Sequence, residues 1–180
     1  MRHTHYRGKA WLWIAFLTLL SACRVDGITE TPGVEATLLI QSAHCTNKNV
    51  EPFVQWITGS EAYKSAYNQT RTHIFGDTSK PPHVDFNRLG VIAVYMGERP
   101  TAGYQVNLAS STAELGEHSE LSLPVSWVEP PGDALLAQVK TSPCILVSIP
   151  KDDYSTIQAI DEDGRVRAST GFMGREQPLN

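Results

Sequence analysis

Short apolar runs and alternating apolar and polar positions dominate the chain after residue 83, a pattern that predicts β-strands. Two of these segments, Leu89–Met96 and Cys144–Ile149, are almost wholly apolar and therefore predict buried strands. Pro124 lies inside another segment, and we expect an edge strand or a bulge there because proline cannot donate to a sheet. The remaining predicted strands are Val34–His44, Tyr104–Leu115, Leu121–Val128, Ala134–Val139, Thr156–Ile160 and Arg165–Ala168.

One segment, Val50–Gln69, has a helical pattern. Phe53, Trp56 and Ile57 fall at i, i+3 and i+4, which predicts an apolar helix face. Ser60 follows a glycine and is suited to cap a second short helix. The polar segment 70–83 that comes next predicts a long loop. The chain is therefore expected to fold as one mainly β domain with one or two short helices, either a β-sandwich or an open barrel.

The first 22 residues have the features of a secretion signal. A basic start is followed by an eleven-residue apolar run, AWLWIAFLTLL, which is short for a membrane span and typical of a signal peptide. The run ends at Leu-Ser-Ala-Cys, which resembles a bacterial lipobox, and this resemblance implies cleavage before Cys23 and lipidation of its sulfur. Ordinary secretion with an incidental cysteine is the alternative. We expect residues 23–35 to form a tether and residues 171–180 a loose tail.

The charge balance differs on the two sides of Cys23. Three of the 15 basic residues lie in the signal, which leaves 12 basic against 19 acidic residues and a net charge of −7. Such a surface argues against a nucleic-acid partner, because that binding depends on basic contacts to phosphate. The residue after the cysteine is Arg24. By resemblance to lipoprotein sorting, the lack of aspartate there implies the periplasmic face of the outer membrane.

The most unusual stretch is YMGERPTAGYQV, residues 95–106, where a predicted strand passes through a loop rich in glycine and proline before strand alternation returns. This arrangement holds several side chains at the rim of a sheet. Arginine and tyrosine are residue types enriched at binding hot spots, so the loop predicts either a structural connection, a recognition loop, or both. The candidate binding residues are Glu98, Arg99, Pro100, Thr101, Gly103 and Tyr104.

Five separated pieces in a fixed order resemble the PrcB family, small bacterial proteins that are mostly secreted or lipid-anchored. The pieces are Asp85-Phe86, Gly97 to Tyr104, Pro130-Pro131-Gly132, Gln138 and Thr141-Ser142-Pro143. The resemblance implies a PrcB-like β domain over residues 36–170 and an association with a surface protease complex. Two positions depart from the family pattern. Cys144 stands where an aromatic residue is common, and Ala102 stands where glycine is usual, so Ala102 must fold without a positive φ.

No catalytic constellation or metal-ligand spacing stands out. The histidines occur singly, and no second pair completes a zinc site, so we expect no metal and no cofactor. Cys45 and Cys144 remain after Cys23 and are either a disulfide, which an oxidising envelope favours, or two buried free thiols. We therefore expect a non-enzymatic lipoprotein of the cell envelope that acts as an accessory or binding module, possible partners being a protease or another protein complex.

A second hypothesis rests on the same loop. The string Pro-Thr-x-Gly-Tyr, residues 100–104, resembles the Asn-Pro-Thr-Thr-Gly-Tyr loop of the chagasin-type inhibitors of cysteine proteases, which are also β-sandwiches. This resemblance implies a peptidase inhibitor that presents the Arg99–Tyr104 loop to a protease cleft.

Overall fold

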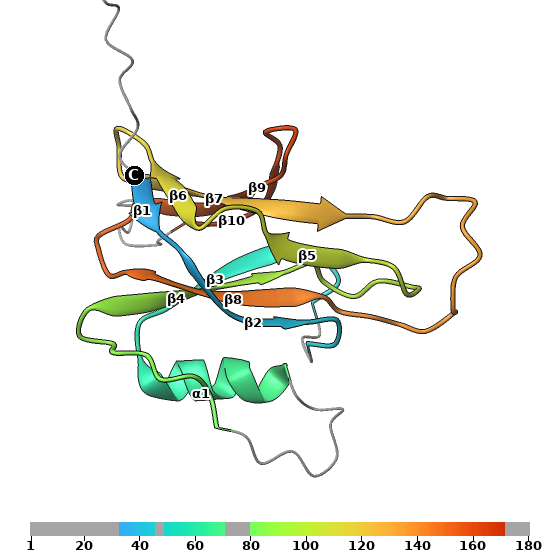
Figure 1. Cartoon of the computed structure of the whole chain (residues 1–180), viewed down its shortest axis with the longest axis horizontal. Helices are drawn as coiled ribbons and strands as arrows, with labels where there is room; N and C mark the ends of the chain where they lie inside the picture. Colours follow the sequence, from blue (N-terminus) through green and yellow to red (C-terminus); the bar gives the residue numbers. More distant parts are fainter. Residues whose placement is uncertain (1–32, 46–48, 71–79, 172–180) are drawn as a thin grey trace, which may run out of the picture. The chain divides into compact units, whose positions relative to one another are not determined.

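Two β-sheets are stacked face to face, and a helix covers the outer face of one of them (Figure 1). The computed structural model describes residues 33–45, 49–70 and 80–171. The six-stranded sheet has the order β1 (Gly33–Glu35), β6 (Thr112–Leu115), β7 (Glu120–Val128), β9 (Thr156–Ile160), β10 (Val166–Gly171), with β5 (Gln105–Leu108) also paired to β7. The four-stranded sheet has the order β2 (Thr37–Ser42), β8 (Cys144–Pro150), β4 (Leu89–Tyr95), β3 (Phe53–Ile57). The predicted mainly β fold is confirmed as a β-sandwich with one short helix.

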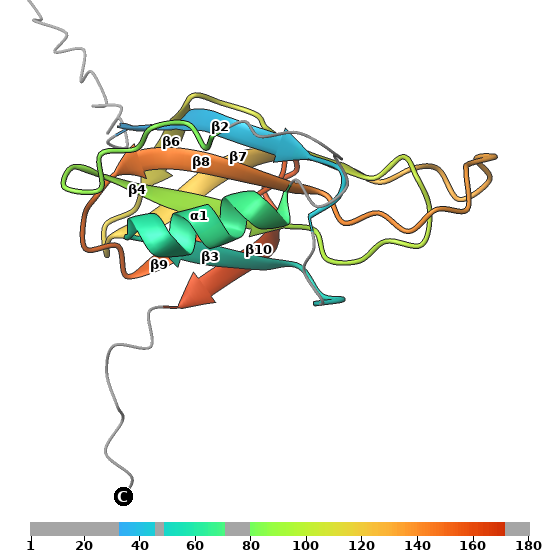
Figure 2. The same cartoon turned by 90° about the horizontal axis from the view of Figure 1, so that it is seen from below.

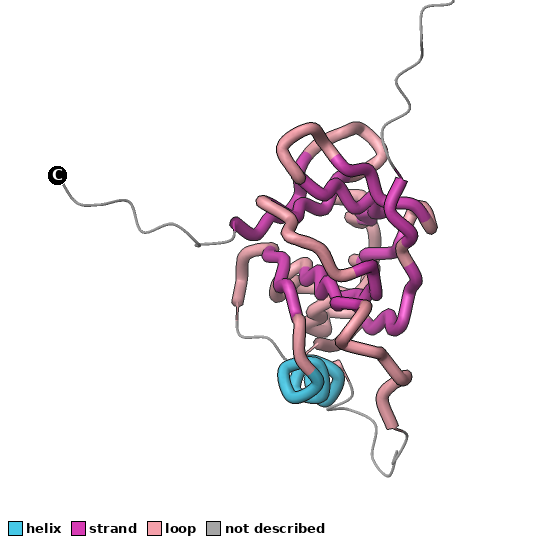
Figure 3. The backbone as a smooth tube through the Cα atoms, turned by 90° about the vertical axis from the view of Figure 1, so that its left-hand side faces the viewer, coloured by secondary structure: helices cyan, strands magenta, loops and turns pink. Residues whose placement is uncertain are grey.

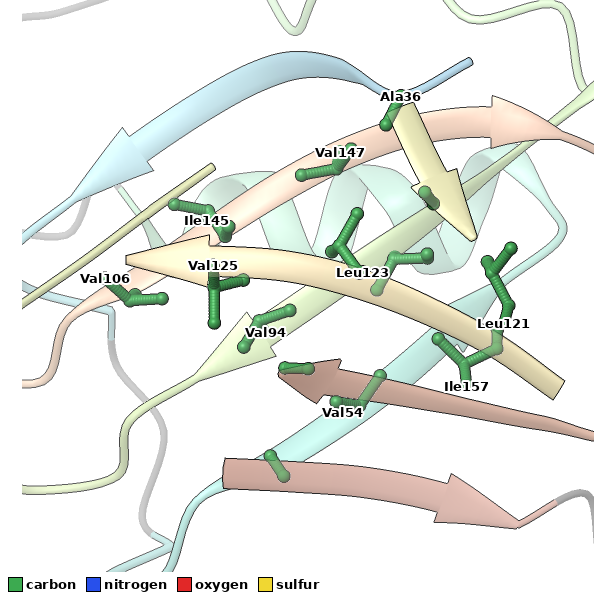
Figure 4. Packing of buried hydrophobic residues seen from close by; sticks show 14 of the residues in the cluster. Ala36, Val54, Val94, Val106, Leu121, Leu123, Val125, Ile145, Val147 and Ile157 are labelled. Carbon is green, nitrogen blue, oxygen red and sulfur yellow. The ribbon is translucent and has the colours of Figure 1, made fainter. Parts of the chain in front are cut away.

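Alternate residues of both sheets fill the space between them. In β7, Leu121, Leu123 and Val125 point inward and are fully buried, while the residues between them are half-buried. They meet the inward residues of β4 and β8, such as Val94 and Val147, in one continuous core (Figure 4). Since β-strand side chains point to opposite faces in turn, the alternation in the sequence of β7 encodes this packing directly.

The helix α1 (Ser60–Gln69) lies against the outer face of the four-stranded sheet (Figures 2 and 3). Its buried residues Tyr63, Ala66 and Tyr67 pack on that face and form a second apolar cluster with the outward residues of β4 and β8. The sheet is therefore covered on both sides. This explains why β4 and β8 read as nearly continuous apolar runs.

The predicted helix over Val50–Ile57 is wrong, because Phe53–Ile57 forms strand β3. Its pattern misleads because both faces of β3 are covered. Phe53 and Ile57 face the cluster under α1, whereas Val54 and Trp56 face the core between the sheets. Apolar residues at i, i+3 and i+4 therefore belong to two strand faces and not to one helix face. The second predicted helix, which starts at Ser60, is confirmed.

Pro124 lies in the middle of the six-stranded sheet, so the prediction of an edge strand is wrong; β7 pairs with β5 and β6 on one side and with β9 on the other. The carbonyl of Pro124 accepts a hydrogen bond from Ala109 N–H at 3.0 Å. Its missing N–H would therefore point at the junction between β5 and β6. Pro124 is a ladder partner of neither β5 nor β6, so its missing N–H removes no hydrogen bond from either ladder.

Two other predicted strands differ from the structure. The single strand expected over Tyr104–Leu115 is two strands, β5 and β6, and the strand expected over Ala134–Val139 is irregular backbone. The hairpin around Asp161 to Gly164 is confirmed, with Gly164 at φ 77° in the turn. The expected signal peptide, the lipidation at Cys23, most of the tether, residues 71–79 of the loop and residues 172–180 of the tail lie outside the described residues.

Candidate functional site

Two long connections run side by side beyond the strand ends, at the right of Figures 1 and 2. One is residues 97–104, which link β4 to β5, and the other is residues 129–142, which link β7 to β8. We call this pair of segments the lobe. The first segment contains all the binding residues predicted from the sequence, and the second contains residues of three pieces of the sequence resemblance but none of the predicted binding residues.

Backbone hydrogen bonds join the two segments of the lobe. Arg99 N–H donates to the Thr141 carbonyl at 2.8 Å, and Thr141 N–H donates to the Arg99 carbonyl at 2.9 Å. Ala102 N–H donates to the Ala137 carbonyl at 3.1 Å, and the Thr141 hydroxyl donates to the Thr101 carbonyl at 2.9 Å. The lobe is therefore a single hydrogen-bonded unit, since each segment provides the pairing that the other lacks.

Two glycines allow the first segment to take this path. Gly97 has φ 79°, and a Cβ atom there would collide with the backbone of Val50. Gly103 has φ 95°, and its Cβ would lie 3.2 Å from Pro130 Cβ and 3.3 Å from Leu136 Cδ1 of the second segment. Ala102 has no positive φ; among the described non-glycine residues only Ser119 does. The expectation for Ala102 is confirmed.

The charged residues of the first segment turn back onto the lobe. The Glu98 carboxylate pairs with the Lys140 ammonium at 2.6 Å, with both side chains largely exposed. The Arg99 guanidinium lies over the Tyr104 ring, 5.9 Å from its centroid, and Arg99 Nε is buried without a hydrogen-bond partner in the described part of the chain. Tyr104 itself packs partly against the core between the sheets. Arg99 and Tyr104 therefore have a packing role in addition to any contact with a partner.

The most exposed apolar side chains of the lobe lie on its second segment. Leu135 is fully exposed, and Val139 is 51% exposed, whereas the neighbouring Leu136 turns inward onto Gly103. Pro100, in the first segment, is also exposed. The apolar pair Leu135-Leu136 is a signal for this feature in the sequence, but the pattern around it predicts a strand. Exposed apolar residues on a projecting segment are typical of protein contact sites.

A cavity of about 410 Å³ lies at the base of the lobe. Its walls are residues 102–106, the pair Val139 and Thr141, Pro143, and residues 41–44 at the end of β2. No aspartate, glutamate, lysine or arginine lines it. We call it the lobe-base cavity.

The start of the second segment is held by a charged network. The Asp161 carboxylate accepts hydrogen bonds from Arg165 N–H at 2.8 Å and from Arg167 Nε at 2.6 Å. Arg167 also pairs with Glu129 at 3.6 Å and lies over the Trp127 ring. The hydrogen bond from the Arg165 backbone, followed by the bonds and charge of Arg167, lowers the pKa of Asp161. The charged groups of Asp161, Arg167 and Glu129 are paired with one another, which indicates that the network has a structural role.

Cys45 and Cys144 form a disulfide, with their Cα atoms 6.1 Å apart. Both residues are fully buried under the cluster that includes α1. Of the two alternatives that the sequence left open, the structure has the bonded one. The disulfide links the end of β2 to the start of β8, next to the cavity walls.

The described residues contain no group of three or more histidine, cysteine, aspartate or glutamate side chains arranged to hold a metal ion. Among the same residues, no helix is long and apolar enough to cross a membrane.

Comparison with known proteins gives one match. Residues 91–150 match the family model described as PrcB C-terminal. This range contains every piece of the sequence resemblance except Asp85-Phe86. No curated protein and no solved structure gives a significant match. The matched range begins in β4, ends with β8, and includes both segments of the lobe. Residues 91–150 of this chain are therefore similar to the PrcB C-terminal family, and the lobe lies within the matched range.

Proposed function

We propose that this protein is a non-enzymatic, lipid-anchored module of the bacterial cell envelope that binds another protein through the lobe. The observation that carries the proposal is the lobe itself, a hydrogen-bonded projection with a fully exposed leucine, Leu135. Burying a leucine side chain contributes about 2 kcal/mol to association, and the disulfide and two sheets hold the base of the lobe in place.

The partner class follows from the family match together with the sequence. PrcB-like proteins suggest a protease or another envelope complex as partner, and the lipobox at Cys23 suggests anchoring at the periplasmic face of the outer membrane. A stable lipid anchor keeps the module at one surface, so even a modest lobe contact would be strengthened by the high local concentration.

Photo-crosslinking in membranes tests this proposal. The full chain would be expressed with benzoylphenylalanine in place of Leu135, and in a matched chain in place of Ala62, an exposed residue of α1. We expect one protein to be crosslinked from position 135 and not from position 62, with both chains retained in the membrane fraction. Equal crosslinking from both positions, or none from position 135, would contradict the proposal.

A peptidase inhibitor is the second candidate, and one observation favours it. Pro100 and Gly103 are exposed in the first segment of the lobe, so the backbone there is open to a protease cleft. Measuring residual activity of papain-like and serine proteases at increasing concentrations of the chain separates the candidates. The inhibitor hypothesis is supported if the chain inhibits a protease, if Pro100→Ala weakens this inhibition and if Leu135→Ser leaves it unchanged. The absence of inhibition across the panel excludes the hypothesis.

A further inference from the structure

We propose that the lobe-base cavity is a subsite for one uncharged residue of an extended peptide segment of the partner, whose backbone pairs with Val106. The inference rests on the proposed binding function and adds a second contact to it. It concerns the cavity between β2 and β5, away from the exposed Leu135.

The cavity is continuous with the lobe and is built by it. Gly103, Tyr104 and Val139 form one wall, and Pro143 closes the base. The opposite wall is Ser42, Ala43 and the end of β2, the outer strand of the four-stranded sheet. A partner that contacts the lobe therefore has the cavity directly beside the contact.

The lining selects the charge of the occupant. Apart from the imidazole of His44, its side chains are apolar or uncharged and polar, while the charged pair Glu98 and Lys140 lies on the lobe outside the lining. A carboxylate or ammonium that entered would lose its hydration without gaining an opposite charge. The volume of about 410 Å³ is within the range of cavities that bind small groups. An uncharged, largely apolar side chain fits these conditions.

The strand register supplies backbone groups for a peptide. Ala109 N–H donates to the Pro124 carbonyl, so residues 109 and 124 are a hydrogen-bonded pair, and in an antiparallel ladder such pairs alternate. Gln105 and Asn107 therefore bond to β7, whereas Val106 directs its N–H and carbonyl away from β7. Val106 also lines the cavity. Among the described strands β5 has β7 as its only partner, so a peptide segment can pair on this side.

The edge lacks the usual protection against pairing. Exposed edge strands usually carry charges, proline or bulges that prevent association. The sequence of β5 is QVNL, without a charge or a proline, and its pairing with β7 is regular. Gln41 of β2, which lines the cavity, donates a side-chain hydrogen bond to Asn107 of β5 across the gap between the two strands. A peptide would enter from the side of the lobe.

A displayed library of random linear peptides is the probe, panned against the full chain with its disulfide intact. Captured peptides would be synthesised and measured against three variants. Ala43→Trp enlarges an exposed residue of the cavity lining, Ala62→Trp makes the same change on α1, and Leu135→Ser alters only the lobe. We expect Ala43→Trp to weaken peptide binding by about tenfold or more, and the other two variants to leave it unchanged.

Two further readouts identify the mode of binding. The amide resonance of Val106 should shift and gain protection from hydrogen exchange, whereas those of Gln105 and Asn107 are protected already. Peptides should lose affinity when the residue in the cavity is changed to aspartate or when one backbone nitrogen is methylated. Failure to capture any peptide, binding indifferent to Ala43→Trp, or an unchanged Val106 amide would overturn the inference. The proposed function is tested separately by Leu135→Ser and the membrane crosslink, so the two failures are distinguishable.

Discussion

Arg99 and Thr141 exchange two backbone hydrogen bonds of 2.8 and 2.9 Å, although 42 positions separate them in the chain. This pair joins the connection after β4 to the connection before β8 and converts two loops into one lobe. Since β4 and β8 are themselves neighbours in the sheet, the pair extends their ladder beyond the last strand residues. The lobe therefore depends on the core for its position.

The contribution of the lobe surface can be separated from that of its interior. Arg99→Ala removes the guanidinium from the Tyr104 ring but keeps both backbone bonds, so we expect a loss of about 0.5–1 kcal/mol in the free energy of unfolding. Leu135→Ser should leave that free energy unchanged and abolish partner capture. Urea denaturation measures the first effect, and affinity capture of the partner from solubilised membranes measures the second. If the Leu135→Ser variant captures the partner as well as the wild type does, the partner must contact other residues of the chain.

Gly97 is predicted to be essential for the entry into the lobe. Gly97→Ala places a Cβ at positive φ against the backbone of Val50, and we expect it to lower the free energy of unfolding by about 2 kcal/mol or more. Gly132→Ala is the matched control, because nothing lies near its Cβ position and its φ is not positive. Denaturant titration of both variants gives the comparison. Equal stability of the two variants would show that the strand can move away from Val50.

Tyr95 carries a buried hydroxyl without a hydrogen-bond partner among the described residues, and its ring stacks on Phe53 with 4.4 Å between centroids. Tyr95→Phe keeps the stacking and removes the unpaired hydroxyl, so we expect the free energy of unfolding to stay equal or to rise by about 1 kcal/mol. Burial raises the pKa of Tyr95 to about 12.

The same tyrosine gives an alkaline signature. In the unfolded chain a tyrosine ionises near pH 10, so the wild-type protein loses stability as the pH rises from about 10 to 12. The Tyr95→Phe variant lacks this contribution and should lose less over that interval. Denaturation curves at neutral and alkaline pH make the measurement. A clear loss of stability in Tyr95→Phe at neutral pH would show that the hydroxyl has a partner.

The disulfide closes a loop with a sequence separation of 99. In the chain-entropy model such a closure stabilises the folded chain by about 5 kcal/mol. Replacing Cys45 and Cys144 together by alanine should therefore lower the free energy of unfolding by several kcal/mol, and the native protein should resist mild reductants because both residues are fully buried. Thiol labelling before and after denaturation checks both points. Rapid labelling of native protein would contradict them.

The environment of Asp161 predicts that the free energy of unfolding decreases in acid. Its pKa is lowered in the folded chain, chiefly by the Arg165 backbone hydrogen bond and also by Arg167, so its ionised form stabilises the fold above its ordinary pKa of 3.8. This contribution disappears as the pH falls below 3.8 toward the lower folded-state pKa. Asp161→Asn should therefore be less stable than the wild type at pH 7, with the difference shrinking in acid. Denaturation curves from pH 7 into acid measure this difference in the free energy of unfolding. A difference that stays constant with pH would show that it does not arise from the titration of Asp161.

Strand β7 and the hairpin between β9 and β10 were predictable because their sequence patterns are local. β7 shows clean alternation, and Asp163-Gly164 supplies the turn. β3 was not predictable, because a strand covered on both faces loses the alternation that identifies strands. The second segment of the lobe was predicted as a strand over Ala134–Val139, because only the tertiary structure divides its apolar pair into an exposed Leu135 and a half-buried Leu136 that packs on Gly103.

The amino-acid sequence by itself determined the mainly β class, the helix from Ser60, the PrcB-like pieces and the unusual loop around Gly97 and Gly103, because each is encoded by neighbouring residues. Only the tertiary structure decided that Cys45 bonds to Cys144, that Arg99 pairs with Thr141, and that a cavity lies at the base of the lobe. These relationships join segments far apart in the chain. They arise from sheet pairing, which no local pattern specifies.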